Sequence, residues 1–266
     1  MMDQLCLDGF DRPLGWWVES AVSAIRQFSG AGYVGGFSGG KDSTAIKALA
    51  RMAGVPVEWH YHVTTVDPPE LVRYIHRQHP DVVFDVPKWG GLWTRIAYHG
   101  VPTRFRRWCC SEYKEGSMRN DGRRILLGVR AAESARRARQ STGFLKIIGR
   151  AEMINPIIYW PDWAVWEFIR AEHLPYCGLY DEGFSRLGCV GCPLTRQGQR
   201  EIEWERWPRI ARLWHHGCDA AWSARQSTRS LFPTPADLWD WWAHHVNDRM
   251  PELDDCQMSI FGEEGL

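Results

Sequence analysis

At residues 33–44 the chain reads Tyr33-Val34-Gly35-Gly36-Phe37-Ser38-Gly39-Gly40-Lys41-Asp42-Ser43-Thr44, a short apolar run followed by a glycine-rich turn. We expect a strand, then a loop, then a helix that opens at Ser43 and Thr44 and ends at Gly54. Adjacent glycines let backbone N–H groups approach a ligand, and a helix start with a lysine forms an anion site. The alternative is an ordinary glycine turn with a solvated Lys-Asp pair.

The segments on either side of this loop predict alternating strands and helices. Apolar residues at helical spacing indicate a helix over residues 14–28. Residues 57–63, 81–86 and 125–129 are strand candidates, and a helix from Pro68 or Pro69 to about His79 lies between the first two. This alternation predicts an α/β fold with a parallel sheet that helices cover on both faces, with ligands at the carboxyl ends of the strands.

Composition excludes some classes of protein. A chain of 266 residues with 44% hydrophobic content can bury one sizeable core, or a core plus a smaller appendage. No apolar run approaches membrane-spanning length, and the N-terminus has no secretory signal pattern, so we expect a soluble, cytoplasmic protein. Residues 104–150 carry thirteen Lys and Arg against four Asp and Glu, which indicates an anionic ligand there, or else a solvated surface helix.

Two cysteine pairs are candidate metal ligands: Cys109-Cys110, after a basic cluster, and Cys189 with Cys192 in a CxxC segment. Four thiolates in two close pairs suit a tetrahedral zinc or an iron–sulfur cluster. Adjacent cysteines project differently from one backbone, which favours a [4Fe–4S] cluster over zinc, and both over buried free thiols. The other cysteines have no such pairing, so we expect each to be a small buried or exposed residue: Cys6, Cys177, Cys218 and Cys256.

Further site candidates follow the strands. Gly128 and Arg130 end the fourth strand candidate, and Arg137 lies early on the next helix. Arginines there can bind phosphate or sulfate oxygens with two parallel hydrogen bonds, and Glu133 can orient either arginine. Thr64, Thr65 and Asp67 follow the second strand candidate and can line the nucleoside side of a site, although the aspartate can equally cap the next helix.

Taken together, these motifs resemble a known family. Ser38-Gly39-Gly40-Lys41-Asp42-Ser43 resembles the PP-loop of ATP pyrophosphatases, and residues 30–195 are similar to the phosphoadenylyl-sulfate/adenylyl-sulfate reductase family. The resemblance implies an adenine nucleotide alpha-hydrolase-like, three-layer fold with a C-terminal helical appendage. It also implies nucleotide binding by the loop, Arg130 and Gly128, and a [4Fe–4S] cluster on Cys109, Cys110, Cys189 and Cys192. The domains expected are residues 1–30, a helix; 31–195, the nucleotide-binding domain; and 196–266, a tryptophan-rich helical tail.

The chain departs from the reductases in one respect. Sulfonucleotide reductases carry a nucleophilic cysteine in a Glu-Cys-Gly-Leu-His segment. Residues 1–266 do not contain this segment, and the residues around Cys256 do not match it. The chain is also similar to the ATP-pyrophosphatase component of DNA phosphorothioation systems, which shares the loop and the cysteines without that segment. This favours sulfur incorporation over sulfite release.

Two features of the C-terminal tail allow alternative interpretations: its tryptophans and a short peptide near its end. Residues 201–266 carry seven tryptophans and twelve acids against six arginines, so core packing is a better interpretation than base stacking. Gln257-Met258-Ser259-Ile260-Phe261 resembles the peptide with which bacterial proteins dock on the sliding clamp, although a short match arises easily by chance and a disordered tail is the safer interpretation.

Three hypotheses follow. The first is an ATP pyrophosphatase that forms AMP and pyrophosphate with Mg²⁺ and activates an oxygen for replacement by sulfur, with DNA as the acceptor and a cysteine desulfurase as the donor. Lys41, Asp42, Arg130 and Arg137 are its expected catalytic residues; Ser38, Gly39, Gly40, Ser43, Thr64, Asp67 and Gly128 bind the nucleotide. The second is reduction of adenylyl sulfate or phosphoadenylyl sulfate to sulfite, with Cys256 as an atypical nucleophile. The third is a nucleotide-binding partner protein without turnover.

Overall fold

A computed structural model describes residues 12–115, 122–140, 143–148, 151–224 and 232–245. The chain forms two compact units that are interleaved in sequence. Unit 1 comprises Met1–His62, Pro69–Asp85 and Met118–Leu187, and unit 2 comprises Val63–Pro68, Val86–Ser117 and Gly188–Leu266. The division into 1–30, 31–195 and 196–266 follows chain order instead and stays a prediction.

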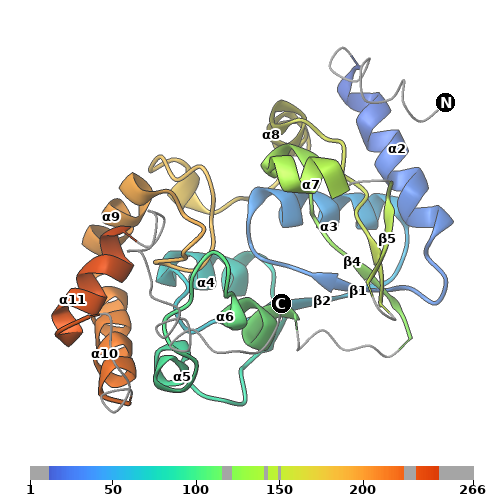
Figure 1. The fold of residues 1–266 in the computed structure, drawn as a ribbon. Helices are drawn as coiled ribbons and strands as arrows, with labels where there is room; N and C mark the ends of the chain where they lie inside the picture. The colour runs from blue at the N-terminus through green and yellow to red at the C-terminus, as the bar shows by residue number, and fades with distance from the viewer. Residues whose placement is uncertain (1–11, 116–121, 141–142, 149–150, 225–231, 246–266) are drawn as a thin grey trace. The chain divides into compact units, whose positions relative to one another are not determined.

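Unit 1 is built on a six-stranded sheet with the strand order β3-β2-β1-β4-β6-β5 (Figure 1). Its strands are β1 (Tyr33–Gly36), β2 (Val57–His62), β3 (Val83–Asp85), β4 (Arg124–Leu126), β5 (Leu145–Ile148) and β6 (Ala151–Ile154). β1 pairs in parallel with β2 and β4, with Val34 opposite Glu58 and Ile125. β1 and β4 are therefore the two middle strands, and the glycine-rich loop leaves from the carboxyl end of β1.

The edge of the sheet differs from the sequence prediction. β5 runs antiparallel to β6, so the sheet is mostly parallel rather than entirely so. β5 ends at Ile148 and β6 begins at Ala151, and such a short connection can only join antiparallel neighbours. The strand pattern was hidden because β5 is an edge strand whose Ile147 is 63% exposed, so its burial does not alternate.

The helices of unit 1 bury hydrophobic side chains in the core of the unit. They are α2 (Leu14–Gln27), α3 (Lys41–Ala53), α4 (Pro69–Gln78), the short 3-10 helix η3 (Ala131–Glu133), α7 (Ala135–Gln140), α8 (Asp162–Ala171) and the 3-10 helix η4 (Gly178–Tyr180). Helices α2, α3 and α8 contact one another. Ile25 and Leu49 have no exposed surface there, and burying such side chains stabilises the fold by about 1.5–3 kcal/mol each.

Unit 2 is helical. It contains α5 (Leu92–His99), α6 (Trp108–Cys110), the π-helical turn η2 (Ser111–Glu115), α9 (Gln197–Arg206), α10 (Pro208–Ala224), α11 (Pro235–Asp240) and the π-helical turn η5 (Trp241–His245). α10 packs on α5 at Gly217, where an added Cβ would lie 2.6 Å from Ile96 Cδ1. The position thus needs glycine for close helix packing.

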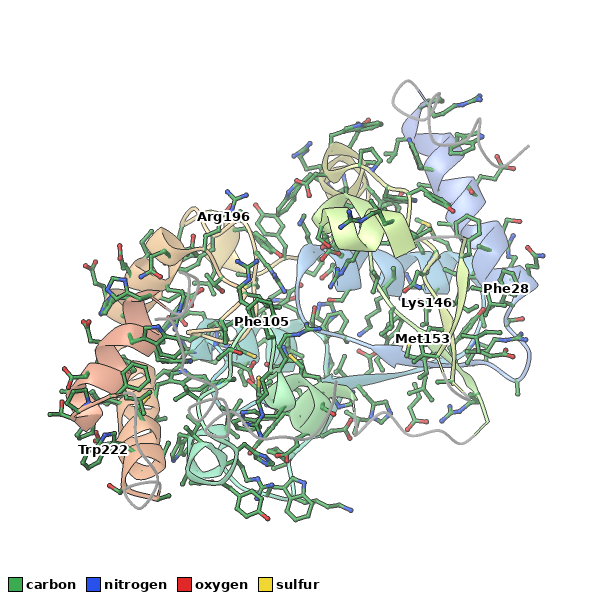
Figure 2. The ribbon with its side chains drawn as sticks, viewed as in Figure 1. Phe28, Phe105, Lys146, Met153, Arg196 and Trp222 are labelled. Atoms are coloured by element: carbon green, nitrogen blue, oxygen red, sulfur yellow. The ribbon has the colours of Figure 1, made fainter. Side chains whose placement is uncertain are left out.

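Tryptophans of the tail form the core of unit 2, which confirms core packing as their main role. Trp214 and Trp242 are 1% and 0% exposed, with ring centroids 4.6 Å apart. Trp214 Nε1 donates to Val190 O at 2.9 Å, and Trp242 Nε1 donates to Pro102 O at 2.8 Å. Trp222, labelled in Figure 2, donates to Phe232 O at 2.9 Å. These three indoles thereby have their N–H groups satisfied, whereas the buried Nε1 of Trp241 has no hydrogen-bond partner among the described residues.

No helix within the described ranges is both long enough and apolar enough to cross a bilayer. Two further predictions, the role of Cys256 and the clamp-like peptide 257–261, concern positions outside the described residues, as does Cys6.

Candidate functional site: a phosphate-type loop and a cysteine centre

The glycine-rich loop joins β1 to α3, and α3 starts earlier than predicted. The helix begins at Lys41, not at Ser43, with Gly40 as its N-cap, and it ends at Gly54 in the left-handed conformation, as expected. Ser43 Oγ donates to Gly40 O at 2.8 Å, and Ser38 Oγ donates to Ser43 Oγ at 3.2 Å. The two serine hydroxyls therefore brace the loop, and amides at such a helix start are suited to bind an anion.

Two glycines allow backbone to pack closely at this loop. Gly39 has φ of +72°, and an added Cβ would lie 2.7 Å from Leu71 Cδ1 and Ile75 Cδ1 on α4. At Gly128 an added Cβ would lie 2.9 Å from the carbonyl carbon of Asp42. Gly128 therefore lets the chain after β4 approach the first turn of α3.

Four charged side chains meet at the start of α3 in a partly buried network. Arg130 Nε donates to Asp42 Oδ1 at 2.5 Å, and Arg130 Nη2 donates to Asp162 Oδ1 at 2.8 Å. Lys41 Nζ lies 3.5 Å from Asp42 Oδ2 and 3.3 Å from Asp162 Oδ1. The Arg130 side chain is 3% exposed, whereas that of Asp162 is 63% exposed. The network thus joins the loop, the segment after β4 and the start of α8.

The electrostatics of this network favour the ionised form of Asp162. Burial alone would raise the pKa of Asp162, but Lys41 and Arg130 outweigh it and hold the pKa below its usual value. Two cations and two carboxylates are balanced without a ligand, so a bound polyphosphate would redirect Lys41 and the loop amides toward its own oxygens.

Sequence reasoning missed two residues of this site, Asp162 and Tyr180. The backbone N–H of Lys41 donates to Tyr180 Oη at 2.9 Å, so a phenol oxygen occupies the start of α3. Burial raises the pKa of Tyr180 and keeps it neutral. The aspartate-tyrosine pair leaves no local pattern, because it comes from α8 and η4, more than a hundred residues after the loop. The helix start at Asp162 was the only available signal.

The structure places Arg130 and Arg137, the two arginines predicted for the site, in different contacts. Glu133 orients the backbone of Arg130, whose N–H donates to Glu133 Oε1 at 3.1 Å, while the Arg130 side chain is set by the network and by Trp160 O at 3.3 Å. Arg137 Nη1 donates to Glu133 Oε2. A catalytic role for Arg137 stays a prediction.

The four predicted cysteine ligands all lie in unit 2. Cys109 and Cys110 lie on α6, and Cys189 and Cys192 flank Gly191. A hydrogen bond with Cys110 and burial raise the pKa of Cys109, and Cys189 and Cys192 add to that effect. Among residues that the structure describes, no three His, Cys, Asp or Glu side chains are already arranged to hold a metal ion. The four thiols therefore lie close enough to affect one another electrostatically, but they are not positioned to coordinate one metal ion.

Polar side chains of unit 2 surround Cys189. Its thiol lies 3.5 Å from Thr64 Oγ1, and its charge raises the pKa of Lys114, which Asp67 and Cys110 raise further. Asp67 Oδ2 accepts the backbone N–H of Thr64 at 2.8 Å and so braces the 64–67 turn. The sequence predicted that Thr64 and Asp67 line a nucleoside. Thr64 contacts Cys189 and Asp67 acts on Lys114 electrostatically, and the nucleoside role stays a prediction.

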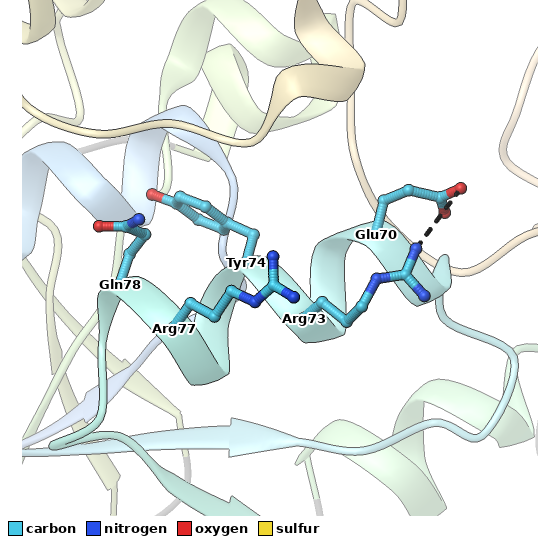
Figure 3. Close-up of a pocket in the computed structure, with 5 residues that line it drawn as sticks. All are labelled: Glu70, Arg73, Tyr74, Arg77 and Gln78. Carbon is cyan, nitrogen blue, oxygen red and sulfur yellow. Dashed lines mark ion pairs between the residues drawn. The ribbon is translucent and has the colours of Figure 1, made fainter.

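The remaining described cysteines lie in the hydrophobic core. Cys177 and Cys218 are 1% and 0% exposed, as expected for unpaired thiols in a core. A shallow hollow lies elsewhere in unit 1, along one face of α4, and shares no residue with the charged network (Figure 3). Its lining is Glu70, Arg73, Tyr74, Arg77 and Gln78, and Arg73 Nη2 lies 4.0 Å from Glu70 Oε1.

Comparison with solved structures shows the fold. The phosphoadenylyl-sulfate reductase from Candida auris, in a phosphate complex, superposes with a TM-score of 0.51 at 16% identity and covers 72% of this chain and 95% of that one. The sheet order and the loop after β1 agree with the adenine nucleotide alpha-hydrolase-like fold, and the tail adds the predicted helical part. The fold prediction is confirmed.

Comparison with curated proteins and with family models shows the family. An uncharacterised protein of Methanocaldococcus jannaschii, MJ0066, is 28% identical over 199 residues, which are 66% of this chain and 40% of that protein. The adenosine 5'-phosphosulfate reductase of Allochromatium vinosum is 30% identical over 158 residues, 57% of this chain and 56% of that enzyme. The chain thus spans only about half the length of these relatives. Residues 33–195 match the model of the phosphoadenosine phosphosulfate reductase domain, and the chain belongs to that family.

Proposed function

We propose that the protein splits ATP into AMP and pyrophosphate to activate an oxygen for replacement by sulfur. The observation that carries this proposal is the ion-pair network of Lys41, Asp42, Arg130 and Asp162 at the start of α3, where Gly40 is the N-cap. Helix amides with a lysine and a fixed arginine suit the oxygens of a polyphosphate. In this reading Lys41 and the loop amides stabilise the charge that develops on the departing pyrophosphate.

Within this proposal each network residue has a separate task. Arg130 is held by two carboxylates and a carbonyl, so it keeps a fixed position for the α-phosphate or the acceptor. Asp162 has the most exposed carboxylate of the network and would hold Mg²⁺, for which oxygen ligands are preferred. The metal would neutralise phosphate charge when bound.

Cys109, Cys110, Cys189 and Cys192 would hold a [4Fe–4S] cluster. The donor set fits that group, because four thiols act on one another within one unit and Lys114 provides a nearby positive charge. When bound, the cluster would supply sulfur or electrons, or stabilise unit 2. Thr64 and Lys114 would position the Cys189 sulfur.

DNA phosphate is the proposed acceptor, with a cysteine desulfurase as the sulfur donor. The turn at 103–106, in which Thr103 N donates to Arg106 O at 3.1 Å, supports this choice. Its tip carries Phe105, which is 96% exposed and labelled in Figure 2, between the exposed Arg104 and Arg107. An exposed ring flanked by arginines can stack on a base while the guanidinium groups contact phosphates.

Two variants test the acceptor. We expect Phe105→Ala to weaken DNA binding by about 1–3 kcal/mol, measured by fluorescence anisotropy at several salt concentrations. Val86→Ala removes another exposed apolar side chain of unit 2 and should leave binding unchanged. Equal losses in both variants would contradict a specific stacking contact.

The second candidate is reduction of adenylyl sulfate or phosphoadenylyl sulfate to sulfite, which the relation to the Allochromatium vinosum enzyme favours. We place it second because residues 1–266 contain no Glu-Cys-Gly-Leu-His segment. The deciding experiment incubates the anaerobically purified protein with ATP or with adenylyl sulfate and a thiol, and identifies the products. AMP and pyrophosphate from ATP support the first function. Consumption of adenylyl sulfate alone, with sulfite release, would establish the second.

A third outcome has its own meaning. Tight ATP binding without turnover, even with DNA and a cysteine desulfurase present, would make the protein a nucleotide-binding partner rather than an enzyme. Lys41→Met should weaken that binding as well, so weaker binding by itself does not separate the two hypotheses; product analysis does.

A further inference from the structure

Arg200 of α9 is a buried cation whose guanidinium has no hydrogen-bond acceptor in the part of the chain that the structure describes. Its side chain has no exposed surface, and none of its three guanidinium nitrogens has a hydrogen-bond partner among the described residues. The guanidinium carbon lies 4.7 Å from the centroid of the Trp242 ring and 5.5 Å from that of Trp204. Burial lowers the pKa of Arg200 to about 10, so it remains charged at neutral pH.

Such an arrangement is unfavourable unless something else accepts these hydrogen bonds. A buried guanidinium with unused N–H groups loses its hydration without recovering it, and folded proteins normally pair such groups. The tryptophan faces attract the charge but do not replace directed acceptors. Glu203 attracts it too, yet Glu203 Oε2 already accepts the backbone N–H of Gly191 at 2.7 Å.

The same contacts connect α9 to the cysteine centre. Gly191 lies between Cys189 and Cys192 with φ of +73°, and an added Cβ there would lie 2.0 Å from the Trp204 ring. The hydrogen bond to Glu203 fixes this segment against α9. Arg200 lies one helical turn before Glu203 and acts electrostatically on Cys192. Arg200, whose nitrogens lack acceptors among the described residues, and the four predicted cysteine ligands therefore lie in the same unit, and α9 connects them.

We propose that Arg200 is a positioning residue for the iron–sulfur group, donating hydrogen bonds to sulfur on the Cys192 side and offsetting the group's negative charge. This inference rests on the proposal that the four cysteines hold the cluster. Hydrogen bonds to the sulfurs and nearby charge set both the retention and the reduction potential of such clusters. Trp204 and Trp242 hold the guanidinium in place before the cluster binds.

The proposal predicts opposite effects of Arg200 with and without the cluster. In the cluster-free protein Arg200 is an unmatched buried charge, so its replacement by an apolar side chain of similar length should leave the thermal midpoint unchanged or raise it. In the loaded protein the same replacement removes donors from the cluster and should lower the midpoint. A purely structural role on the tryptophan faces would lower both.

The experiment uses Arg200→Met, Arg200→Lys and the control Arg196→Met, which removes an exposed arginine at the N-cap of the same helix (labelled in Figure 2). Proteins are purified anaerobically and assayed for iron and sulfide, for iron release to a chelator, and for the reduction potential by spectroscopic titration. Iron release should be about 10-fold faster or more in Arg200→Met. Its reduction potential should fall, because a buried cation favours the more negative reduced cluster. Arg200→Lys should lie between, and Arg196→Met should match the unchanged protein.

Three results would overturn the inference. An unchanged potential and release rate in Arg200→Met would show that the cluster does not depend on this side chain. Lower midpoints in both the loaded and the cluster-free protein would show a structural role alone. An unchanged protein without iron and sulfide would remove the cluster proposal and this inference with it, whereas ATP turnover, measured separately, tests the proposed reaction on its own.

Discussion

The loop site of unit 1 and the cysteine centre of unit 2 differ in how their charges are matched. At the loop, Lys41 and Arg130 each lie within 3.5 Å of carboxylate oxygens, so the site is electrically balanced before any ligand binds. At the cysteines, the thiols are not closed into a ligand set among the described residues, and the nitrogens of Arg200 lack acceptors there.

This difference indicates two ways of preparing a site. A polyphosphate exchanges readily, so a site for it benefits from partners that hold Lys41 and Arg130 in place between turnovers. A resident cofactor binds once, and its binding free energy can compensate for buried charges that are costly in its absence. The loop site should therefore fold without its ligand, whereas the cysteine centre should gain stability from its own.

Loss of one cysteine ligand should have the largest effect. We expect Cys189→Ser to abolish stable iron and sulfide incorporation, because a cluster with a missing thiolate is lost readily. Iron analysis after anaerobic purification measures this, and Cys177→Ala, at a buried thiol outside the centre, should retain full content. A Cys189→Ser protein with normal iron would mean that the two regions do not differ as described.

Removal of the loop lysine should act on turnover and not on the fold. Lys41→Met should lower the rate of pyrophosphate release from ATP by about 10²–10³-fold, the usual cost of a lost charge-stabilising donor. Lys146→Met, at an exposed lysine of β5, removes the same charge without effect. Steady-state assays with matched circular dichroism spectra separate the two, and comparable rates would place the chemistry elsewhere.

Acid should weaken unit 1 through a buried histidine beside α3. Burial, and then Lys47, lower the pKa of His79 from 6.5 to about 4; Asp81 opposes this, and Tyr74 Oη lies 3.0 Å from His79 Nε2. The folded protein therefore binds fewer protons than the unfolded chain between these values. The free energy of unfolding should be full above pH 6.5 and fall by roughly 2–3 kcal/mol toward pH 4.

Urea titrations from pH 7 to 4 measure that decrease. His79→Gln should flatten the profile between pH 6.5 and 4, whereas the exposed His216→Gln should not. If the His79→Gln protein loses stability over this range as steeply as the unchanged protein, another group must be responsible.

The smallest of these effects should come from the close approach at Gly128. Gly128→Ala forces a methyl group against the Asp42 backbone and should destabilise the protein by about 1–3 kcal/mol. ATP turnover should fall more than stability does, because the start of α3 moves. Gly15→Ala, where an added Cβ meets nothing within 4 Å, should be neutral or stabilising. Thermal unfolding and ATP assays on both variants check this.

Much of the loop site followed from local sequence because strands and helices leave periodic patterns, and glycines mark where backbone must turn or approach. Tyr33–Gly36, the loop and Gly54 were predicted at or near their observed bounds. The predicted start of α3 was late because Lys41 and Asp42 read as loop residues, although a glycine N-cap needs no serine or threonine after it.

Tertiary structure alone decided what these residues contact. Asp162 and Tyr180 reach the loop through folding of distant segments, and no local pattern carries such pairings. The same holds for the grouping of residues 63–68 with the cysteines and the tail, and for the burial of Arg200. The sequence determined the family, the loop and the candidate ligands, because these are chemical identities at fixed spacing. Which charges are matched and which are left unsatisfied depends on distances between segments, and only the folded chain sets those.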